Sequence, residues 1–234
     1  YKDANITFVG CSRWLSGRAK KSYLLRGKAV LSIPNPIDTK VYHPMDQGMA
    51  RELLGLASGK RLLLFGALNV TDKRKGIDYL IEALRRMEKQ DVELVVFGQV
   101  KDDIRGLFPV PIHSMGYLSD ESKIVALYNA VDMFITSSLE ENLPNTIMES
   151  MACGTPCVGF EIGGIPEMID HRVNGYVANY KDAGDLANGI QWVLEHEDRL
   201  ALSDACVKKV QENYTEEVVA KQYTALYEKL LKGE

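Results

Sequence analysis

Short apolar runs alternate with helix-length amphipathic segments along almost the whole chain. Most of these runs are continuously apolar rather than alternating, which is typical of strands that are covered on both faces. We therefore expect strands at Ile6–Gly10, Ala29–Ile33, Arg61–Gly66, Val92–Gly98, Pro111–Met115, Val131–Thr136, Pro156–Phe160 and Gly175–Ala178.

The amphipathic segments between these runs predict helices, and two further helices are expected at the C-terminus. Local residues mark several starts: Ser119 is expected to cap a helix with an acidic first turn, and Pro144 suits a first helical position. The expected helices are Arg13–Leu25, Met45–Leu54, Gly76–Met87, Asp120–Ala130, Pro144–Cys153 and Asp182–His196.

Strand–helix–strand alternation implies right-handed crossover connections between parallel strands. The expected fold class is therefore α/β, with a doubly wound, Rossmann-like parallel sheet. Ligands of such sheets lie at the carboxyl ends of the strands, near helix N-termini. We therefore expect a site among the loops that follow Phe65, Phe97, Met115 and Thr136.

Composition and charge narrow the class of function. The 234 residues include 28 Lys and Arg and 32 Asp and Glu, a formal net charge of −4. This balance argues against a dedicated nucleic-acid binder, which needs a clustered excess of Lys and Arg to neutralise phosphates. The longest apolar stretches, such as that from Leu62 to Leu68, are far shorter than the roughly 20 residues of a membrane-spanning helix.

The cysteines are too few and too irregularly spaced for a disulfide framework or a metal site. We expect reduced thiols in the core of a cytoplasmic protein. The cysteines are Cys11, Cys153, Cys157 and Cys206.

The segment after the expected strand Val131–Thr136 carries the most chemistry. Glu141 lies in a polar loop and Glu149 on the following helix, so the two carboxylates bracket the free N–H groups at the helix start. Such N–H groups and the helix dipole favour phosphate, and a fixed carboxylate can accept hydrogen bonds from vicinal ribose hydroxyls. The pattern therefore suits a sugar phosphate, although each glutamate taken singly could equally be a solvated surface charge.

This segment resembles the E-x7-E signature of retaining GT-B glycosyltransferases, and its Asn-Leu-Pro-Asn-Thr loop resembles the branch that acts in bacterial surface-polysaccharide synthesis. Other stretches resemble the same group in the same order, so that the likeness covers nearly the whole chain. They are Cys11-Ser-Arg-Trp14, Ile33-Pro-Asn-Pro-Ile-Asp38, Lys75-Gly-Ile-Asp-Tyr-Leu80, Gly116-Tyr-Leu118, Ser150-Met-Ala-Cys-Gly-Thr-Pro-Cys-Val158, Gly163-Gly-Ile-Pro-Glu167 and Asp185-Leu-Ala187.

The resemblance implies a role for each matching residue of the donor site. Glu149 would bind the ribose hydroxyls of a nucleotide sugar, and Glu141 would hold the donor sugar together with backbone N–H groups of Asn142, Leu143 and Asn145, in the loop that also contains Pro144.

Asn145 and Thr146, at the helix start, would meet the diphosphate. Lys75 would offset the charge that develops on the departing diphosphate. Gly116 and Tyr117 would lie beside the base. No metal ion and no further cofactor is expected.

One step departs from the group's pattern. Its members usually carry an Arg soon after the first strand of this domain, as a second cation for the diphosphate, whereas this chain reads Gly66-Ala67-Leu68. We expect Arg74 to substitute for it from a neighbouring position. A solvated basic loop is the alternative for Arg74 and for Lys73.

The domain boundaries are also expectations from the resemblance. The chain would be the donor-binding, C-terminal half of a GT-B fold, with residues 1–40 leading in from a missing acceptor domain. Residues 213–234 would end in a helix with Val219, Tyr223, Leu226 and Leu230 on one face. This face would either pack on the chain's own sheet or dock in part on the missing domain.

The expected activity is transfer of a sugar, with retained configuration, from a nucleotide diphosphate to a glycan or lipid-linked acceptor. The isolated chain should bind the nucleotide but transfer poorly. Membrane contact would be peripheral only. Two alternatives remain, namely a nucleotide-sugar epimerase of the same architecture and a non-catalytic nucleotide-binding module. Gly163 and Gly164 would permit a close approach to a ligand or a tight turn, and Glu167 would contact the ligand or begin a helix.

Overall fold

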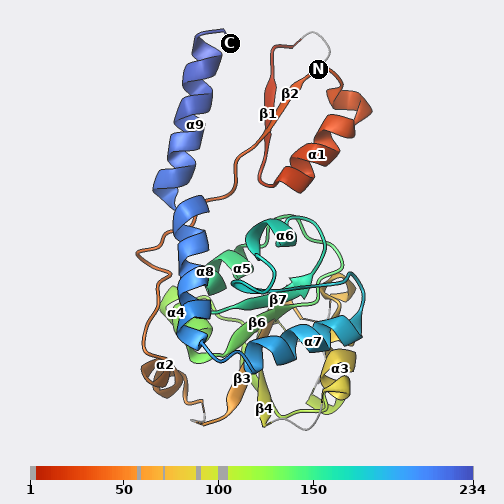
Figure 1. The fold of residues 1–234 in the computed structure, drawn as a ribbon, viewed down its shortest axis with the longest axis vertical. Helices are drawn as coiled ribbons and strands as arrows, with labels where there is room; N and C mark the ends of the chain where they lie inside the picture. The colour runs from red at the N-terminus through yellow and green to blue at the C-terminus, as the bar shows by residue number, and fades with distance from the viewer. Residues whose placement is uncertain (1–3, 57–58, 71, 88–90, 100–104, 234) are drawn as a thin grey trace.

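Six parallel strands form the central sheet, in the order β5-β4-β3-β6-β7-β8 (Figure 1). The computed structural model describes residues 4–56, 59–70, 72–87, 91–99 and 105–233. Every neighbouring pair of strands in this sheet is parallel, which confirms the predicted doubly wound α/β fold. The strands are β3 Arg61–Asn69, β4 Val92–Gln99, β5 Ile112–Gly116, β6 Met133–Thr136, β7 Cys157–Phe160 and β8 Gly175–Ala178.

Both faces of the sheet are buried because successive side chains of a strand point to opposite faces. In β3, Leu62 and Leu64 pack into a core with α2, α4 and α5, whereas Leu63 and Phe65 pack into a core with α3 and α7. Helix α8 packs against α5. The helices are α2 Gln47–Leu54, α3 Ile77–Arg86, α4 Glu121–Ala130, α5 Asn145–Ala152, α7 Ala183–Leu194 and α8 Arg199–Asn213.

The first two strands form a sheet of their own. Strands β1 (Thr7–Gly10) and β2 (Ala29–Ser32) pair in parallel, and α1 (Arg13–Lys21) connects them with the short 3-10 turn η1 (Tyr23–Leu25). Figure 1 shows this unit above the six-stranded sheet, with the C-terminal helix α9 (Glu216–Leu231) beside it.

Helix α9 packs its apolar face against this upper unit. Val219 and Leu226, with the half-buried Tyr223, form a small cluster with Ile33, which directly follows β2. The face therefore packs on the chain itself, beside the two-stranded sheet and not on the six-stranded one. Leu230 remains exposed.

Some helix ends differ from the sequence-based prediction. The segment Arg13–Leu25 is broken, because Ser22 adopts an extended backbone after Lys21 and a 3-10 turn follows. Helix α4 is capped by Asp120, whose carboxylate accepts a hydrogen bond from the backbone N–H of Ser122, rather than by Ser119.

The start of α5 and the segment behind it also differ. Pro144 occupies the N-cap position and not the first helical position, and α5 begins at Asn145. A single-turn helix, α6 (Ile165–Met168), follows Gly164 and has Glu167 in its first turn, which agrees with the expectation that Glu167 belongs to a helix start. Its bounds could not be predicted, because four residues are too few to show a helical apolar pattern.

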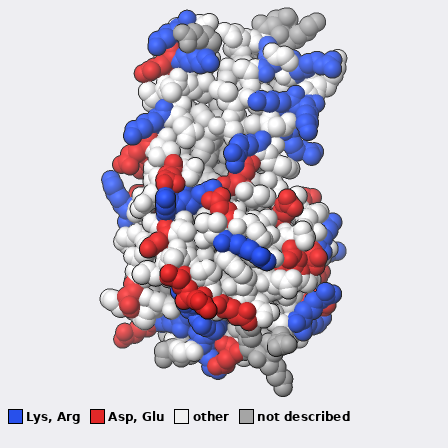
Figure 2. Space-filling model, viewed as in Figure 1, with Lys and Arg blue, Asp and Glu red and all other residues white. Residues whose placement is uncertain are grey.

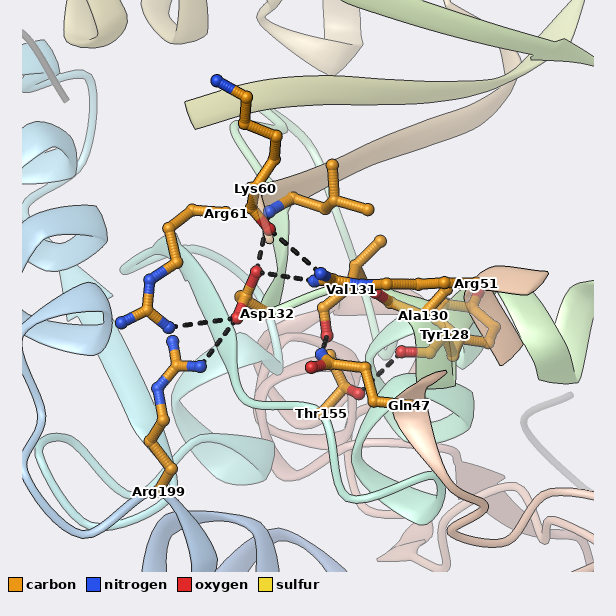
Figure 3. Close-up of polar contacts among 11 residues, drawn as sticks. Gln47, Arg51, Lys60, Arg61, Tyr128, Ala130, Val131, Asp132, Thr155 and Arg199 are labelled. Atoms are coloured by element: carbon orange, nitrogen blue, oxygen red, sulfur yellow. Dashed lines mark hydrogen bonds and ion pairs between the residues drawn. The ribbon is translucent and has the colours of Figure 1, made fainter. Parts of the chain in front are cut away.

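A buried carboxylate ties several elements together at the amino-terminal edge of the sheet (Figure 3). Asp132 precedes β6 and accepts hydrogen bonds from the backbone N–H of Leu62 at 2.7 Å and from the guanidinium of Arg199 at 2.7 Å. Arg51 and Arg61 pair with the same carboxylate at 3.2 Å and 3.3 Å. Because Asp132 is at the edge opposite the candidate site described below, we assign it a structural role.

The cysteines are all free, as predicted. Cys153, Cys157 and Cys206 are buried, and burial raises the pKa of Cys153 and of Cys157 to about 12. These thiols are therefore protonated at neutral pH. Cys11 differs from the prediction in one respect, because it is only half-buried.

Charge is unevenly distributed over the molecule. Residues 4–37 include Arg and Lys but neither Asp nor Glu, although the chain as a whole carries a net charge of −4. Figure 2 shows basic side chains gathered at the upper right, where α1 and the turn after it lie. Among the described residues, no helix combines the length and the apolar character needed to cross a membrane.

Candidate active site

Strands β3 and β6 lie side by side at the centre of the sheet. From β3 the chain moves outward through β4 to β5, and from β6 it moves the opposite way through β7 to β8. The connections that leave two such adjacent strands therefore diverge to opposite sides of the sheet. This topological switch point is where doubly wound sheets bind their ligands.

The loop after β3 is shaped by a glycine that contacts the loop after β6. Gly76 has a φ of +62°, and a Cβ built on it would lie 2.0 Å from the carbonyl oxygen of Ser137. The hydroxyl of Ser137 donates to the carbonyl oxygen of Lys75 at 3.0 Å, and the N–H of Leu139 donates to that of Arg74 at 2.7 Å. Close packing of the two loops thus fixes the backbone of Lys75.

An ion pair joins the two loops. The ammonium of Lys75 pairs with Oε1 of Glu141, 66 positions later in the sequence, and the same oxygen accepts a hydrogen bond from the hydroxyl of Ser138 at 3.0 Å. The side chains are 31% and 15% exposed, so the pair is partly shielded from water. The structure therefore brings together two of the three residues predicted to be catalytic.

The third predicted residue, Arg74, has a different partner. Its guanidinium is 67% exposed and pairs with the carboxylate of Asp72 at 2.7 Å. The hydrogen bonds from the side chain and the backbone N–H of Arg74 lower the pKa of Asp72 to about 2. Arg74 lies on the same 3-10 turn as Lys75, η2 (Lys73–Lys75), but its guanidinium points to its own loop.

The loop that carries Glu141 is held from behind by two glycines. A Cβ on Gly163 would lie 1.9 Å from the carbonyl oxygen of Glu141, and the N–H of Gly164 donates to that of Asn142 at 2.5 Å. These glycines therefore permit a close approach of the chain's own loop, whereas the expectation was an approach to a ligand or a tight turn. Leu143 is buried in the core beneath this loop.

Asn142 points its side chain at the upper unit. Its amide oxygen accepts a hydrogen bond from the hydroxyl of Ser12 at 2.6 Å, and its amide nitrogen donates to the thiol sulfur of Cys11 at 2.8 Å. Both contacts lie at the turn between β1 and α1. Asn145 is exposed and Thr146 half-buried in the first turn of α5, where backbone N–H groups have no partner within the helix.

Glu149 lies on the second turn of α5, apart from Glu141. It is half-buried, and its Oε2 accepts a hydrogen bond from the hydroxyl of Tyr128 at 2.8 Å. Burial raises the pKa of Glu149, and the hydrogen bond from Tyr128 acts in the opposite direction. Tyr128 was missed in the sequence, because a tyrosine in an apolar helical segment is indistinguishable from a core residue.

The remaining predicted positions lie at the carboxyl ends of β3 and β5. Gly66 leaves room for the ring of Phe97 on β4, because a Cβ there would lie 1.9 Å from that ring. Gly116 ends β5 with a φ of +64°, and the side chain of Tyr117 is 60% exposed.

Glu167 makes a contact that the sequence did not indicate. Its carboxylate accepts hydrogen bonds from the backbone N–H groups of Arg13 at 2.9 Å and Trp14 at 2.8 Å, which begin α1. It therefore binds the N-terminus of α1, favoured by the helix dipole, and not that of its own helix. Beside it, an open hollow of about 400 Å³ is lined by Trp14, Leu139, Glu140, Glu141, Asn142 and Ile162.

A doubly wound parallel sheet with charged loops at its switch point defines a Rossmann-like α/β protein with a candidate ligand site at the carboxyl edge of the sheet. The chain belongs to the family of glycosyl transferases group 1, whose pattern matches residues 59–196, more than half of the sequence.

Two curated relatives show the range of similarity. N-acetyl-alpha-D-glucosaminyl L-malate synthase of Bacillus anthracis is 24% identical over 213 residues, which cover 88% of this chain and 55% of that protein. N,N'-diacetylbacillosaminyl-diphospho-undecaprenol alpha-1,3-N-acetylgalactosaminyltransferase of Campylobacter jejuni is 33% identical over 118 residues, which cover 50% of this chain and 31% of that protein. The chain thus spans about half the length, or less, of these relatives.

A solved structure with the same fold is that of HepE from Anabaena, in complex with UDP-glucose. It superimposes with a TM-score of 0.78 at 19% sequence identity, over 95% of this chain and 63% of that chain. At this level of identity the likeness establishes the fold, in agreement with the strand order described above.

Proposed function

We propose that this chain is the donor-binding part of a retaining glycosyltransferase of the E-x7-E group, which moves a sugar from a nucleotide diphosphate to an acceptor hydroxyl. The observation that carries the proposal is the ion pair of Lys75 and Glu141 across the switch point, with Glu149 on the second turn of the adjoining helix. Membership of the glycosyl transferases group 1 family and the UDP-glucose in the Anabaena structure support the same ligand class.

The diphosphate would lie at the start of α5. The free N–H groups of Asn145 and Thr146 and the positive end of the helix dipole favour an anion there. Lys75, from the opposite loop, would supply a full positive charge at the oxygen that carries the electrons of the broken bond to the sugar. With these groups in place, we propose that the reaction requires no divalent cation.

Glu141 would hold hydroxyls of the donor sugar and not attack its anomeric carbon. Oε1 of Glu141, which pairs with the Lys75 ammonium and accepts a hydrogen bond from Ser138, has its lone pairs engaged and is a weakened nucleophile. The acceptor would approach from the hollow that is lined by the indole of Trp14 and by the carboxylates of Glu140 and Glu141, an aromatic surface with a few polar groups as in other small-molecule sites. A glycan or lipid-linked acceptor, as in surface-polysaccharide synthesis, is part of the proposal.

The two glutamates provide the test. We expect Glu149→Ala to weaken nucleoside diphosphate binding to this chain by about tenfold or more, because a charged partner of the ribose is lost. We expect Glu141→Ala to leave that binding nearly unchanged but to reduce turnover by the complete protein. Isothermal titration with UDP, GDP and ADP and a transfer assay measure the two effects.

A matched pair of lysines controls for charge. Lys73 and Lys75 belong to the same 3-10 turn, but only Lys75 pairs with Glu141. Lys75→Ala should impair binding and transfer, whereas Lys73→Ala should impair neither. Full transfer activity in Glu141→Ala and Glu149→Ala would refute the site, and binding without any turnover would favour a non-catalytic module.

A further inference from the structure

A buried tyrosine hydroxyl holds one oxygen of the carboxylate at Glu149. Tyr128, on α4, is only 1% exposed, and its hydroxyl lies 2.8 Å from Oε2 of Glu149. The second oxygen, Oε1, accepts no hydrogen bond from the residues that the structure describes. One oxygen of the carboxylate is thus fixed by the protein and the other is available to a ligand.

The hydroxyl itself has little freedom to move. The ring of Tyr128 packs edge-on against Phe97 and Phe134, with centroid separations of 6.2 Å and 6.0 Å. Its backbone carbonyl accepts a hydrogen bond from the hydroxyl of Thr155 at 2.7 Å (Figure 3). Gly66 makes room for Phe97 and so supports the same stack. Packing on several sides therefore determines where the tyrosine hydroxyl lies.

The groups around Glu149 shift its pKa in opposite directions. Burial and the carboxylate of Glu121 raise the pKa of Glu149, and the hydrogen bond from Tyr128 lowers it. The other titratable groups that face it, Tyr42 and Cys153, have pKa values raised chiefly by burial and stay neutral near pH 7. Tyr128 is therefore the neighbour that favours the ionised carboxylate.

We propose that Tyr128 is the positioning residue that orients the Glu149 carboxylate to accept hydrogen bonds from the ribose hydroxyls of a nucleoside diphosphate. The inference rests on the proposed function. Two vicinal hydroxyls bind a fixed carboxylate more tightly than a freely rotating one, because the freely rotating carboxylate loses orientational entropy on binding. A fixed carboxylate at this point also favours ribose over a sugar that lacks these hydroxyls.

The test compares Tyr128→Phe with a matched control. Tyr176 is also a buried tyrosine whose hydroxyl donates to a carboxylate, Oδ1 of Asp185, at 2.8 Å, but it lies away from the site on β8. We expect Tyr128→Phe to weaken UDP binding by about tenfold, and Tyr176→Phe to leave it unchanged. With 2′,3′-dideoxy-UDP, which lacks the hydroxyls, wild type and Tyr128→Phe should bind equally weakly.

The pH profile separates positioning from a merely structural role. UDP affinity should fall as the pH drops through the pKa of Glu149, because the protonated carboxyl is a poorer acceptor. Without the tyrosine hydroxyl that pKa is higher, so in Tyr128→Phe the fall should begin at a higher pH. A structural defect would instead lower the affinity for UDP and for the dideoxy analogue alike at every pH.

The outcomes distinguish this inference from the proposed function. If wild type binds none of UDP, GDP and ADP, the proposed function fails. If wild type binds UDP and Tyr128→Phe binds it with the same affinity and pH profile, the role of Tyr128 is overturned. If Tyr128→Phe does not fold, Phe97→Leu is the second variant, because it removes one of the rings that pack against Tyr128 and keeps the tyrosine hydroxyl. A smaller loss of affinity for UDP, with no loss for the dideoxy analogue, supports the proposal. Unchanged UDP affinity in Phe97→Leu overturns it.

Discussion

The hydroxyl of Ser12 donates a hydrogen bond to the amide oxygen of Asn142 at 2.6 Å, across 130 positions of the sequence. This contact joins the loop that carries Glu141 to the turn at the start of α1. Glu167 reinforces the junction by binding the backbone N–H groups at the same helix end. The candidate site is thus anchored to the upper unit by directional hydrogen bonds, and not only by apolar contact.

We expect Asn142→Ala to destabilise this junction. Ser12 is buried, and loss of its acceptor would leave its hydroxyl without that partner, at a cost of about 1–3 kcal/mol. Amide hydrogen exchange should become faster in α1, and chemical denaturation should report the loss of stability. Asn213→Ala removes a comparable amide hydrogen bond, to the carbonyl of Lys209, and should leave exchange in α1 unchanged. Equal exchange in α1 for both variants would contradict the anchoring role.

Gly76→Ala should separate the two loops of the site. The added methyl group would collide with the carbonyl oxygen of Ser137, in addition to the strain of a positive φ. Gly55 has nearly the same φ, +63°, with no atom near the added Cβ, so Gly55→Ala isolates the strain, about 1 kcal/mol. We expect Gly76→Ala to lower the free energy of unfolding clearly more than Gly55→Ala does. We also expect Gly76→Ala, but not Gly55→Ala, to lower the affinity for the nucleotide. Equal losses measured by denaturation and titration would argue against close packing of the loops.

Arg74→Ala tests whether this residue replaces the cation missing from the Gly66-Ala67-Leu68 step. A guanidinium that binds the diphosphate should contribute on the order of 1–3 kcal/mol to nucleoside diphosphate affinity. Because Arg74 pairs with Asp72, Asp72→Asn should release the guanidinium and not abolish binding. Calorimetry with UDP and with the corresponding nucleoside measures the diphosphate contribution. Unchanged affinity in Arg74→Ala would show that the arginine stays with Asp72.

Glu149→Gln should stabilise the unliganded chain while it loses the ligand. Burial raises the folded-state pKa of Glu149, so the ionised carboxylate destabilises the folded state wherever it must carry its charge. This penalty is present in full above the folded-state pKa and disappears as the pH falls below the pKa of the unfolded chain. The amide keeps an oxygen that can accept from Tyr128. Chemical denaturation at several pH values between about 3 and 8, a range that includes the usual carboxyl pKa values, measures this difference. The free energy of unfolding of Glu149→Gln should exceed that of wild type at neutral pH, and the excess should vanish in acid. An excess that does not change with pH would contradict this account.

The sequence by itself determined the layers of the fold. Apolar runs of strand length and amphipathic segments of helix length are local patterns, and their alternation permits few arrangements other than a parallel sheet covered on both faces. The same reasoning placed the loops of Lys75 and Glu141 at the carboxyl edge. The ends of two helices differ from the prediction, at Ser22 and at Pro144, because the capping of a helix depends on one or two side chains.

Only the tertiary structure decided which side chains meet. Glu167 binds a helix more than 150 positions earlier, and Tyr128 serves Glu149 from a neighbouring helix, and neither relation leaves a periodic trace in the sequence. Arg74 shows the converse, since its nearest partner, Asp72, is local although its expected role was at the ligand. Contacts of this kind depend on how elements pack in space, whereas hydrophobic periodicity reports only the face that each element buries.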